Sequence, residues 1–184
     1  MKAPVRRFIL VCCVAMLAFA ASGAAPRGKQ PSLLDRPRAT AAQLKVLDRL
    51  VGTWDVRVTV RAPLPGTVTY AETYEWVLDR QFLRCETTVK SDGTKELSMT
   101  TYDAAVGSYH VWVFSTSNGA YELPFGAWDA QTRSMDWTSG PNTQLSFTSH
   151  WTFPDANTRR WTARLKDWKG QVVLDLDGTC IRRR

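Results

Sequence analysis

The dipeptide Asp-Ala recurs at one fixed interval, at Asp103-Ala104, Asp129-Ala130 and Asp155-Ala156, each pair 26 residues after the one before. That interval fits two strands and two turns, which is the period of a β-meander. A second series of turn signals falls between these pairs, at residues 63–66, 91–93, 117–119, 139–142 and 169–170. Because the two series alternate, they predict the two rims of an all-β, antiparallel up-and-down barrel.

Ten strands are predicted from these turns and from the alternation of apolar with polar residues. The first is the clearest, because Trp54, Val56, Val58 and Val60 share one face of it. The predicted ranges are 53–61, 67–78, 81–90, 95–102, 108–115, 119–128, 133–138, 143–153, 158–167 and 171–182. Closure into a barrel removes both exposed edges, and ten strands leave more interior room than eight, so an internal cavity is expected.

A short helix is predicted in front of the first strand. The chain has 184 residues, 44% of them hydrophobic, which is enough for one core, so a single folded domain over residues 40–184 is expected. Within it Leu44, Leu47 and Leu50 recur at helical spacing after Thr40, a suitable N-cap residue. We expect this amphipathic helix to close one end of the barrel.

The N-terminal part of the chain has the pattern of an export signal. A basic start (residues 2–7) precedes an apolar run (residues 8–21) and a group of small residues (22–25). The apolar run is shorter than the roughly 20 residues of a membrane span, so cleavage is favoured over an uncleaved anchor. Residues 1–25 are predicted to be a signal peptide and residues 26–39 a disordered linker. The protein is expected to be periplasmic or secreted, with no stable membrane span after processing.

The formal net charge of +7 does not predict a nucleic-acid-binding protein. The positive excess lies in the first 39 residues and in Arg182, Arg183 and Arg184, while residues 40–181 carry slightly more acidic than basic groups. Binding of nucleic acid requires a basic face rather than basic ends. No nucleic-acid partner is therefore expected.

The beginning and the end of the predicted barrel carry a family resemblance. Residues 50–55, Leu-Val-Gly-Thr-Trp-Asp, open the first strand directly after the helix, as the Gly-x-Trp signature does in the calycin superfamily, which includes lipocalins and fatty-acid-binding proteins. With the hairpin from Tyr102 to Gly107 and the basic end of the last strand, residues 40–184 resemble the calycin-like bacterial family of domains of unknown function numbered fifteen-seventy-nine.

This resemblance implies a barrel with an apolar interior and an undetermined ligand. In calycins the tryptophan of the signature packs under a basic side chain of the last strand. The resemblance therefore implies structural roles for Gly52 and Trp54, with Arg182 or Arg183 as the basic partner.

The lining of the cavity is predicted from the apolar faces of the strands. Charged side chains on such a face must be paired or must meet a ligand, because an unpaired buried charge is strongly destabilising. Arg84 would then hold an anionic head group; the alternative is that its strand is inverted and Arg84 and Glu86 face water. The candidate ligand-binding residues are Tyr70, Glu72, Tyr74, Trp76, Arg84, Trp112, Phe114 and Trp137, with Val58, Phe147 and Trp151 as further apolar lining.

Cys85 and Cys180 remain after the predicted cleavage. Their even number and an oxidising compartment favour a disulfide. In the predicted strand order, however, two strands lie between them, which separates them by about 14 Å, beyond the roughly 7 Å limit for bridged Cα atoms. Separate cysteines are therefore favoured.

Catalytic, metal and cofactor sites are not predicted. His150 belongs to the polar face of its strand and is expected to point outward, whereas His110 shares the face of Trp112 and Phe114. The sequence contains no zinc-ligand spacing, no glycine-rich phosphate loop and no nucleophile beside a base. The repeated aspartates have a structural explanation, because Asp side chains hydrogen-bond to the backbone of the turn that they begin.

Two functions remain open at this point. The favoured one is binding of a small hydrophobic or amphipathic ligand inside the barrel, without catalysis. The alternative is a barrel packed solid by its aromatic side chains that acts as an envelope protein-interaction module. The volume of the cavity discriminates between them, and a homodimer through exposed aromatic residues is left open.

Overall fold

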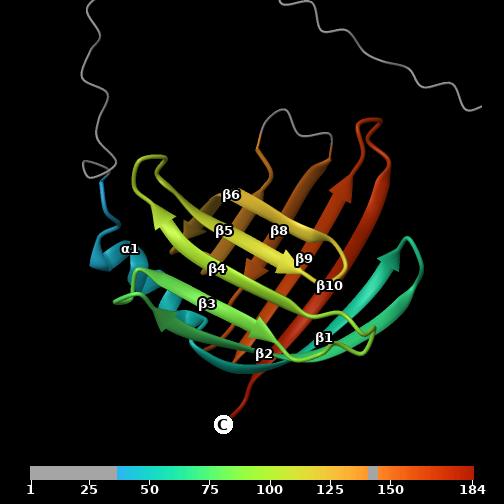
Figure 1. Cartoon of the computed structure of the whole chain (residues 1–184), viewed down its shortest axis with the longest axis horizontal. Helices are drawn as coiled ribbons and strands as arrows, with labels where there is room; N and C mark the ends of the chain where they lie inside the picture. Colours follow the sequence, from blue (N-terminus) through green and yellow to red (C-terminus); the bar gives the residue numbers. More distant parts are fainter. Residues whose placement is uncertain (1–36, 141–144) are drawn as a thin grey trace, which may run out of the picture. The chain divides into compact units, whose positions relative to one another are not determined.

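The computed structural model describes residues 37–140 and 145–184. Ten antiparallel strands form a closed barrel, in which each strand pairs with its neighbours along the chain and β1 pairs with β10 (Figure 1). The strands are β1 (Gly52–Ala62), β2 (Gly66–Val77), β3 (Phe82–Thr87), β4 (Glu96–Asp103), β5 (Ser108–Ser115), β6 (Gly119–Asp129), β7 (Ser134–Thr138), β8 (Ser146–Thr152), β9 (Thr158–Lys166) and β10 (Val172–Arg182).

The predicted ten-stranded barrel is confirmed, and no strand end differs from its predicted position by more than three residues. The predicted signal peptide lies outside the described residues, and so does the predicted linker up to residue 36.

The predicted helix is present and is short. Helix α1 (Ala41–Lys45) continues as a 3₁₀ turn, η2 (Val46–Arg49). Thr40 caps it with a capping box, because Thr40 Oγ1 accepts from the backbone of Gln43 at 3.3 Å and Gln43 Oε1 accepts from the backbone of Thr40 at 2.7 Å. Leu47 and Leu50 enter the barrel core. Figure 1 shows α1 at the end of the barrel to which the arrows of β2 and β4 point, so it covers that rim.

The repeated aspartates are turn residues, as predicted. Their Oδ1 atoms accept a backbone hydrogen bond two residues further on, at 2.9 Å for Asp103, 2.7 Å for Asp129 and 2.7 Å for Asp155. All three turns lie at the rim that α1 covers, because they join β4 to β5, β6 to β7 and β8 to β9. The turns of the other series at residues 63–66, 91–93, 117–119 and 169–170 lie at the opposite rim.

Trp54 and Arg182 connect the first strand, the last strand and the helix. Trp54 is fully buried, and its indole N–H donates to the carbonyl of Leu50 at 2.7 Å. The Arg182 guanidinium lies over the Trp54 ring, 4.1 Å from its centroid, and donates to the carbonyls of Val51 and, at 2.7 Å, of Arg49. This contact stabilises both the ring stack and the end of the helical segment.

The resemblance also singled out Gly52 and Arg183, which lie at the start of β1 and on the outer surface. Gly52 has a φ of +114°, and a Cβ there would lie 2.8 Å from Arg182 Nη1, so only glycine fits this turn into β1. Arg183 does not reach Trp54; it pairs on the outer surface with Asp55 at 2.6 Å. Of the two arginines, Arg182 is therefore the partner of Trp54.

Gly178 of β10 lies against the indole of Trp161 on β9, and a Cβ at this position would overlap with that ring. We expect Gly178→Ala to lower the free energy of unfolding by about 1–3 kcal/mol, because a rigid ring next to backbone must move. Urea unfolding measures this. Gly66→Ala is the matched control, since a Cβ at Gly66 meets nothing within 4 Å. Equal stability of the two variants would contradict the close packing of Trp161.

Candidate functional site

A cavity of about 400 Å³ lies inside the barrel. It extends from the buried side chain of Arg159 to the hairpin loops that join β3 to β4 (residues 88–95) and β5 to β6 (residues 116–118). Those loops belong to the rim opposite α1. The cavity therefore has a floor near the helix-covered end and a mouth at the other end.

The floor is formed by an ion pair between Arg159 of β9 and Glu72 of β2. Their side chains are only 2% and 6% exposed, and β2 and β9 are not neighbours in the sheet, so the pair crosses the interior. Arg159 also donates to the hydroxyl of Tyr74 at 3.0 Å and to the sulfur of Cys180 at 3.1 Å, and its guanidinium lies 4.7 Å from the centroid of Trp151. The guanidinium is thus held by four side chains.

Burial governs the protonation of this pair. Burial raises the pKa of Glu72, and the charge and hydrogen bond of Arg159 oppose the shift. Burial alone would lower the pKa of Arg159, but the interactions of Arg159 with Glu72, Tyr74 and Cys180 together outweigh burial, and the net shift is upward. Arg159 therefore stays positively charged, and each group compensates the other.

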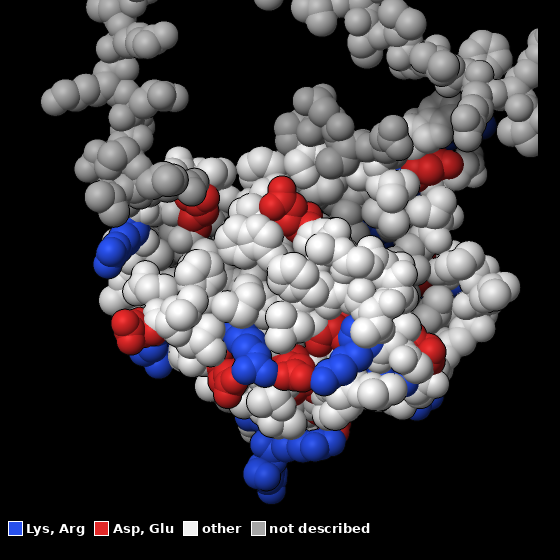
Figure 2. Space-filling view, in the orientation of Figure 1, with Lys and Arg blue, Asp and Glu red and all other residues white. Residues whose placement is uncertain are grey.

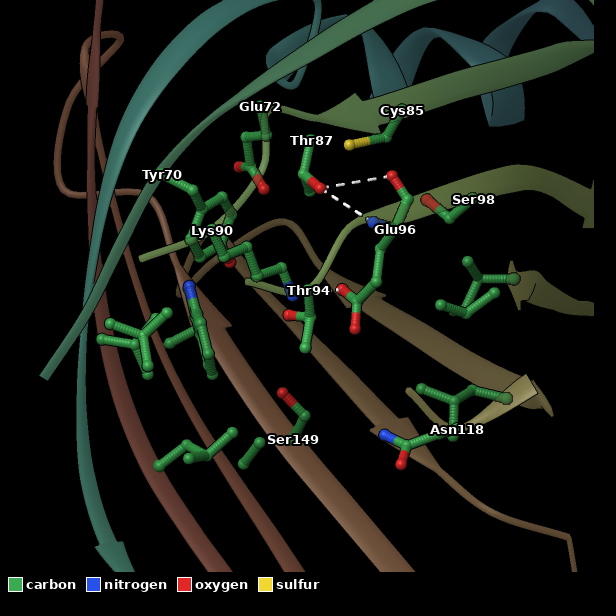
Figure 3. A pocket seen from close by; sticks show the side chains of 18 of the residues that line it. Tyr70, Glu72, Cys85, Thr87, Lys90, Thr94, Glu96, Ser98, Asn118 and Ser149 are labelled. Carbon is green, nitrogen blue, oxygen red and sulfur yellow. Dashed lines mark hydrogen bonds and ion pairs between the residues drawn. The ribbon is translucent and has the colours of Figure 1, made fainter. Parts of the chain in front are cut away.

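One wall of the cavity is polar. It consists of side chains from β3 and β4 and the loop between them, and Figure 3 shows the labelled members gathered on one side. Thr87 ties the two strands together, because its Oγ1 accepts from the backbone N–H of Glu96 at 2.9 Å. The polar members are Cys85, Thr87, Thr94, Glu96, Ser98 and Thr100.

The facing wall is apolar. Most of its side chains come from β1, β2, β5, β6 and β8 to β10 and are apolar; the polar members among them are Tyr70, Ser117, Asn118, Tyr121 and Ser149. The apolar members are Val58, Val60, Val68, Val111, Val113, Leu123, Phe147, Trp151, Trp161, Ala163, Leu174 and Leu176. The cavity is therefore two-sided, with hydroxyl groups facing hydrocarbon.

A second ion pair lies toward the mouth. Lys90 Nζ is 2.7 Å from a carboxylate oxygen of Glu96, and the Lys90 side chain is only 11% exposed. The same ammonium lies 4.9 Å from the centroid of the Tyr70 ring. Asp92 lines the mouth and accepts from Thr94 Oγ1 at 2.7 Å.

Two buried donors have no hydrogen-bond partner in the described part of the chain: Trp137 Nε1 and Arg159 Nε. Both side chains line the cavity. Each nitrogen is itself closed off, so an acceptor in the cavity reaches it only after a side-chain shift.

Comparison with known proteins places the chain in a family. Residues 39–180 match the family described as "Protein of unknown function (DUF1579)". The chain belongs to this DUF1579 family. The resemblance in the first strand and the last strand is thereby confirmed. No curated protein matches the sequence.

Solved structures resemble the DUF1579 barrel in fold. Rv2717c from M. tuberculosis superposes with a TM-score of 0.60 at 14% identity, over 79% of this chain and 100% of that one. An S-type phycobiliprotein lyase, CPES from Guillardia theta, has a TM-score of 0.48 at 11% identity, over 76% and 92% of the two chains. A redesigned β-barrel, mFAP0, bound to DFHBI, has a TM-score of 0.42 at 16% identity, over 73% and 99%. The match to Rv2717c shows a shared barrel fold.

Half of the predicted ligand-binding residues line the cavity of the DUF1579 barrel. They are Tyr70, Glu72, Tyr74 and Trp137, and the further apolar residues Val58, Phe147 and Trp151 line it as well. Trp76 also lies on the inner side of β2, but beyond the floor, where its indole donates to Asp48 of η2 at 2.7 Å.

Arg84 does not line the cavity. The prediction that Arg84 binds an anionic head group there is therefore wrong. In β3 the inward residues are Leu83, Cys85 and Thr87, and Arg84 lies on the opposite face. Arg84 pairs on the outside with Glu75 at 3.0 Å and with Glu86. The alternative, that these charges face water, is the correct one.

The prediction that Trp112 and Phe114 of β5 face the cavity is wrong. The inward residues are Tyr109, Val111 and Val113, which puts Phe114 outside at 48% exposure. The face of β5 with the larger rings is the outer one.

The two histidines are also on the outside. His110 stacks on Trp112 with ring centroids 4.0 Å apart, and its Nε2 lies 3.2 Å from Glu122. His150 pairs with Asp136 at 2.6 Å, and its predicted outward position is confirmed. Within residues 37–140 and 145–184, no three His, Cys, Asp or Glu side chains come together as metal ligands would.

The predicted separation of the cysteines agrees with the structure, in which Cys85 and Cys180 are free and buried. Their strands, β3 and β10, are separated by β2 and β1. Burial raises the pKa of both thiols, which keeps them protonated at neutral pH.

Arg159 is the main residue that sequence analysis missed. A signal for it exists, because Arg159 alternates with Trp161 and Ala163 and so shares their apolar face. An arginine that faces the interior needs an inward-facing carboxylate as its partner, because an unpaired buried charge is strongly destabilising, and Glu72 is that partner.

The outer surface carries interspersed charges. Figure 2 shows blue and red side chains side by side over most of the visible face of the described chain, with a small group of adjoining blue side chains at its lower edge. None of the helices among the described residues has the length and apolar character that crossing a membrane requires.

Proposed function

We propose that this protein is an exported barrel that binds a small amphipathic molecule in its interior. The observation that carries the proposal is the two-sided cavity of about 400 Å³. This volume lies within the range of about 300–1,000 Å³ that is typical of small-molecule sites, and such sites combine apolar walls with a few polar groups. Hydroxyl groups opposite hydrocarbon favour a ligand that has a polar and an apolar side.

The packed barrel is the less supported function. It requires aromatic side chains to fill the interior, whereas a space of about 400 Å³ stays open between them. Contact of water with the apolar wall is unfavourable, so displacement of this water makes the binding of a ligand more favourable.

Export is supported by the basic start, the apolar run and the small residues of the first 25 positions. If the full chain is expressed in a Gram-negative host, we expect the product to appear in the periplasmic or secreted fraction and to begin at residue 25 or 26. A cytoplasmic product with an intact N-terminus would contradict export without bearing on the cavity.

Ligand binding is tested with the uncharged fluorescent probe N-phenyl-1-naphthylamine. Ala163 is buried on the apolar wall, so Ala163→Phe places a ring in the cavity; Ala127 is exposed on β6, so Ala127→Phe is the matched control. We expect Ala163→Phe to weaken probe binding at least about tenfold, equivalent to about 1.4 kcal/mol, and Ala127→Phe to leave it unchanged.

Circular dichroism melting checks that both variants fold, and Val111→Phe is a second blocking variant on the same wall. No probe binding by the wild-type protein, or equal binding by all variants, would overturn the proposed function.

A further inference from the structure

We infer that the ligand of this cavity is uncharged and carries hydroxyl or carbonyl oxygens along one side. The inference rests on the proposed function, because it concerns the same cavity. It is carried by the balance of charges along the lining and by the chemistry of the polar wall.

The cations of the cavity already have partners. Among the described residues that line it, the cations are Lys90 and Arg159. Lys90 pairs with Glu96 at 2.7 Å, and Arg159 pairs with Glu72. A third acidic residue, Asp92, lines the mouth. An anionic head group thus meets carboxylates and no cation that is free to receive it.

A cationic head group is also disfavoured at depth. The carboxylates that lie beyond the mouth, Glu72 and Glu96, are occupied by Arg159 and Lys90. A ligand cation would have to displace one of these protein cations and leave it buried without a partner. An uncompensated buried ion is unfavourable by several kcal/mol, so a head group of either charge is rejected in the part of the cavity beyond the mouth.

The polar wall nevertheless has hydrogen-bonding capacity. Ser98, labelled in Figure 3, and Thr100 place hydroxyl groups on it. The hydroxyls of Thr87 and Ser149 already donate to the carbonyls of Glu96 and Thr162, so they offer a ligand acceptor capacity only. A hydroxyl group both donates and accepts, so it pairs with neutral oxygens without supplying charge. The lining therefore suits oxygens on an uncharged molecule.

The charge part of the inference is tested with four probes of one chain length: decane, decan-1-ol, decanoate and decylammonium. Binding to the full mature protein at pH 7.5 is measured by calorimetry below the aggregation concentration of each probe. We expect decan-1-ol to bind at least about tenfold tighter than either ion and tighter than decane. Decanoate or decylammonium binding as tightly as the alcohol, or decane binding as tightly, would overturn the inference.

A variant separates rejection by the lining from the general cost of dehydrating an ion. Glu96→Gln releases Lys90 from its carboxylate, so the affinity for decanoate should rise about tenfold relative to the affinity for decan-1-ol. Glu86→Gln is the matched control, because Glu86 pairs with Arg84 and Lys95 on the outer face. Unchanged decanoate binding by Glu96→Gln would overturn the inference.

Failure of the inference and failure of the proposed function are distinguishable. If Ala163→Phe blocks the binding of N-phenyl-1-naphthylamine, but decan-1-ol binds no more tightly than decanoate or decylammonium, only the inference fails. If the wild-type protein binds no probe at all, the proposed function fails with it.

Discussion

Replacement of Arg159 by methionine is expected to lower the free energy of unfolding by about 3–5 kcal/mol. The change leaves the carboxylate of Glu72 in the barrel interior, where its side chain is 6% exposed, without the guanidinium that compensates it. Urea unfolding at pH 7 measures the loss. Arg160→Met is the matched control, because Arg160 is the next residue along β9 and is exposed; it should change stability by less than about 0.5 kcal/mol.

The Arg159→Met defect should depend on pH. Burial already raises the pKa of Glu72, and removal of Arg159 takes away the charge that opposes this shift. An acid with a higher pKa in the folded state than in the unfolded state, about 4.3, binds its proton more tightly when folded. Its burial is therefore tolerated at low pH and becomes destabilising as the pH rises through the folded-state pKa.

The stability deficit of Arg159→Met should accordingly shrink as the pH falls from 7 toward 4. Adding Glu72→Gln to this variant should recover part of the stability at pH 7 and remove the pH dependence. A deficit that is the same at pH 4 and pH 7 would show that lost packing, and not the unpaired carboxylate, is the cause.

Replacement of Trp54 by alanine is expected to lower the free energy of unfolding by about 3–5 kcal/mol. The indole is fully buried, supports the Arg182 guanidinium at 4.1 Å and donates to Leu50 at 2.7 Å. Its loss therefore disconnects β1, β10 and the helical segment at once. Thermal and urea unfolding measure the effect, and Trp54→Phe, which keeps an aromatic ring, should lose less.

Trp168 provides the matched control for this variant. Its side chain is 76% exposed in the turn between β9 and β10, so Trp168→Ala should change stability by less than about 0.5 kcal/mol. Similar losses for Trp54→Ala and Trp168→Ala would contradict the role of Trp54 as the central contact of this rim.

The barrel could be predicted because its turns are chemically explicit. Asp103, Asp129 and Asp155 bind the backbone of their own turns, and this local interaction needs no tertiary contact to be recognised. The structural roles of Gly52 and Trp54 are implied by the resemblance of residues 50–55 to the Gly-x-Trp signature.

The faces of β3 and β5 that point into the barrel could not be predicted in the same way, and β5 shows why. In β5 both faces are largely apolar, because Tyr109, Val111 and Val113 alternate with Trp112 and Phe114. Alternation then gives the period of the strand but not its phase. The phase is set by pairing with β4 and β6 in the closed barrel, which is a tertiary constraint.

The centre of the site depends on contacts that are distant in sequence. Glu72 and Arg159 lie 87 residues apart, on strands that are not neighbours in the sheet. The alternation in β2 predicts that Glu72 faces inward, but no pattern in the sequence identifies Arg159 as its partner. The cavity itself is the difference between the interior of the barrel and the volume of all the side chains that enter it, and no local pattern reports that difference.

The most direct test of the central claim is native mass spectrometry of the protein purified from its own host without added ligand. We predict a reproducible extra mass that corresponds, after solvent extraction, to an uncharged amphipathic molecule; Ala163→Phe should lose this mass and Ala127→Phe should keep it. A protein that carries no extra mass and binds none of the uncharged probes would contradict the account.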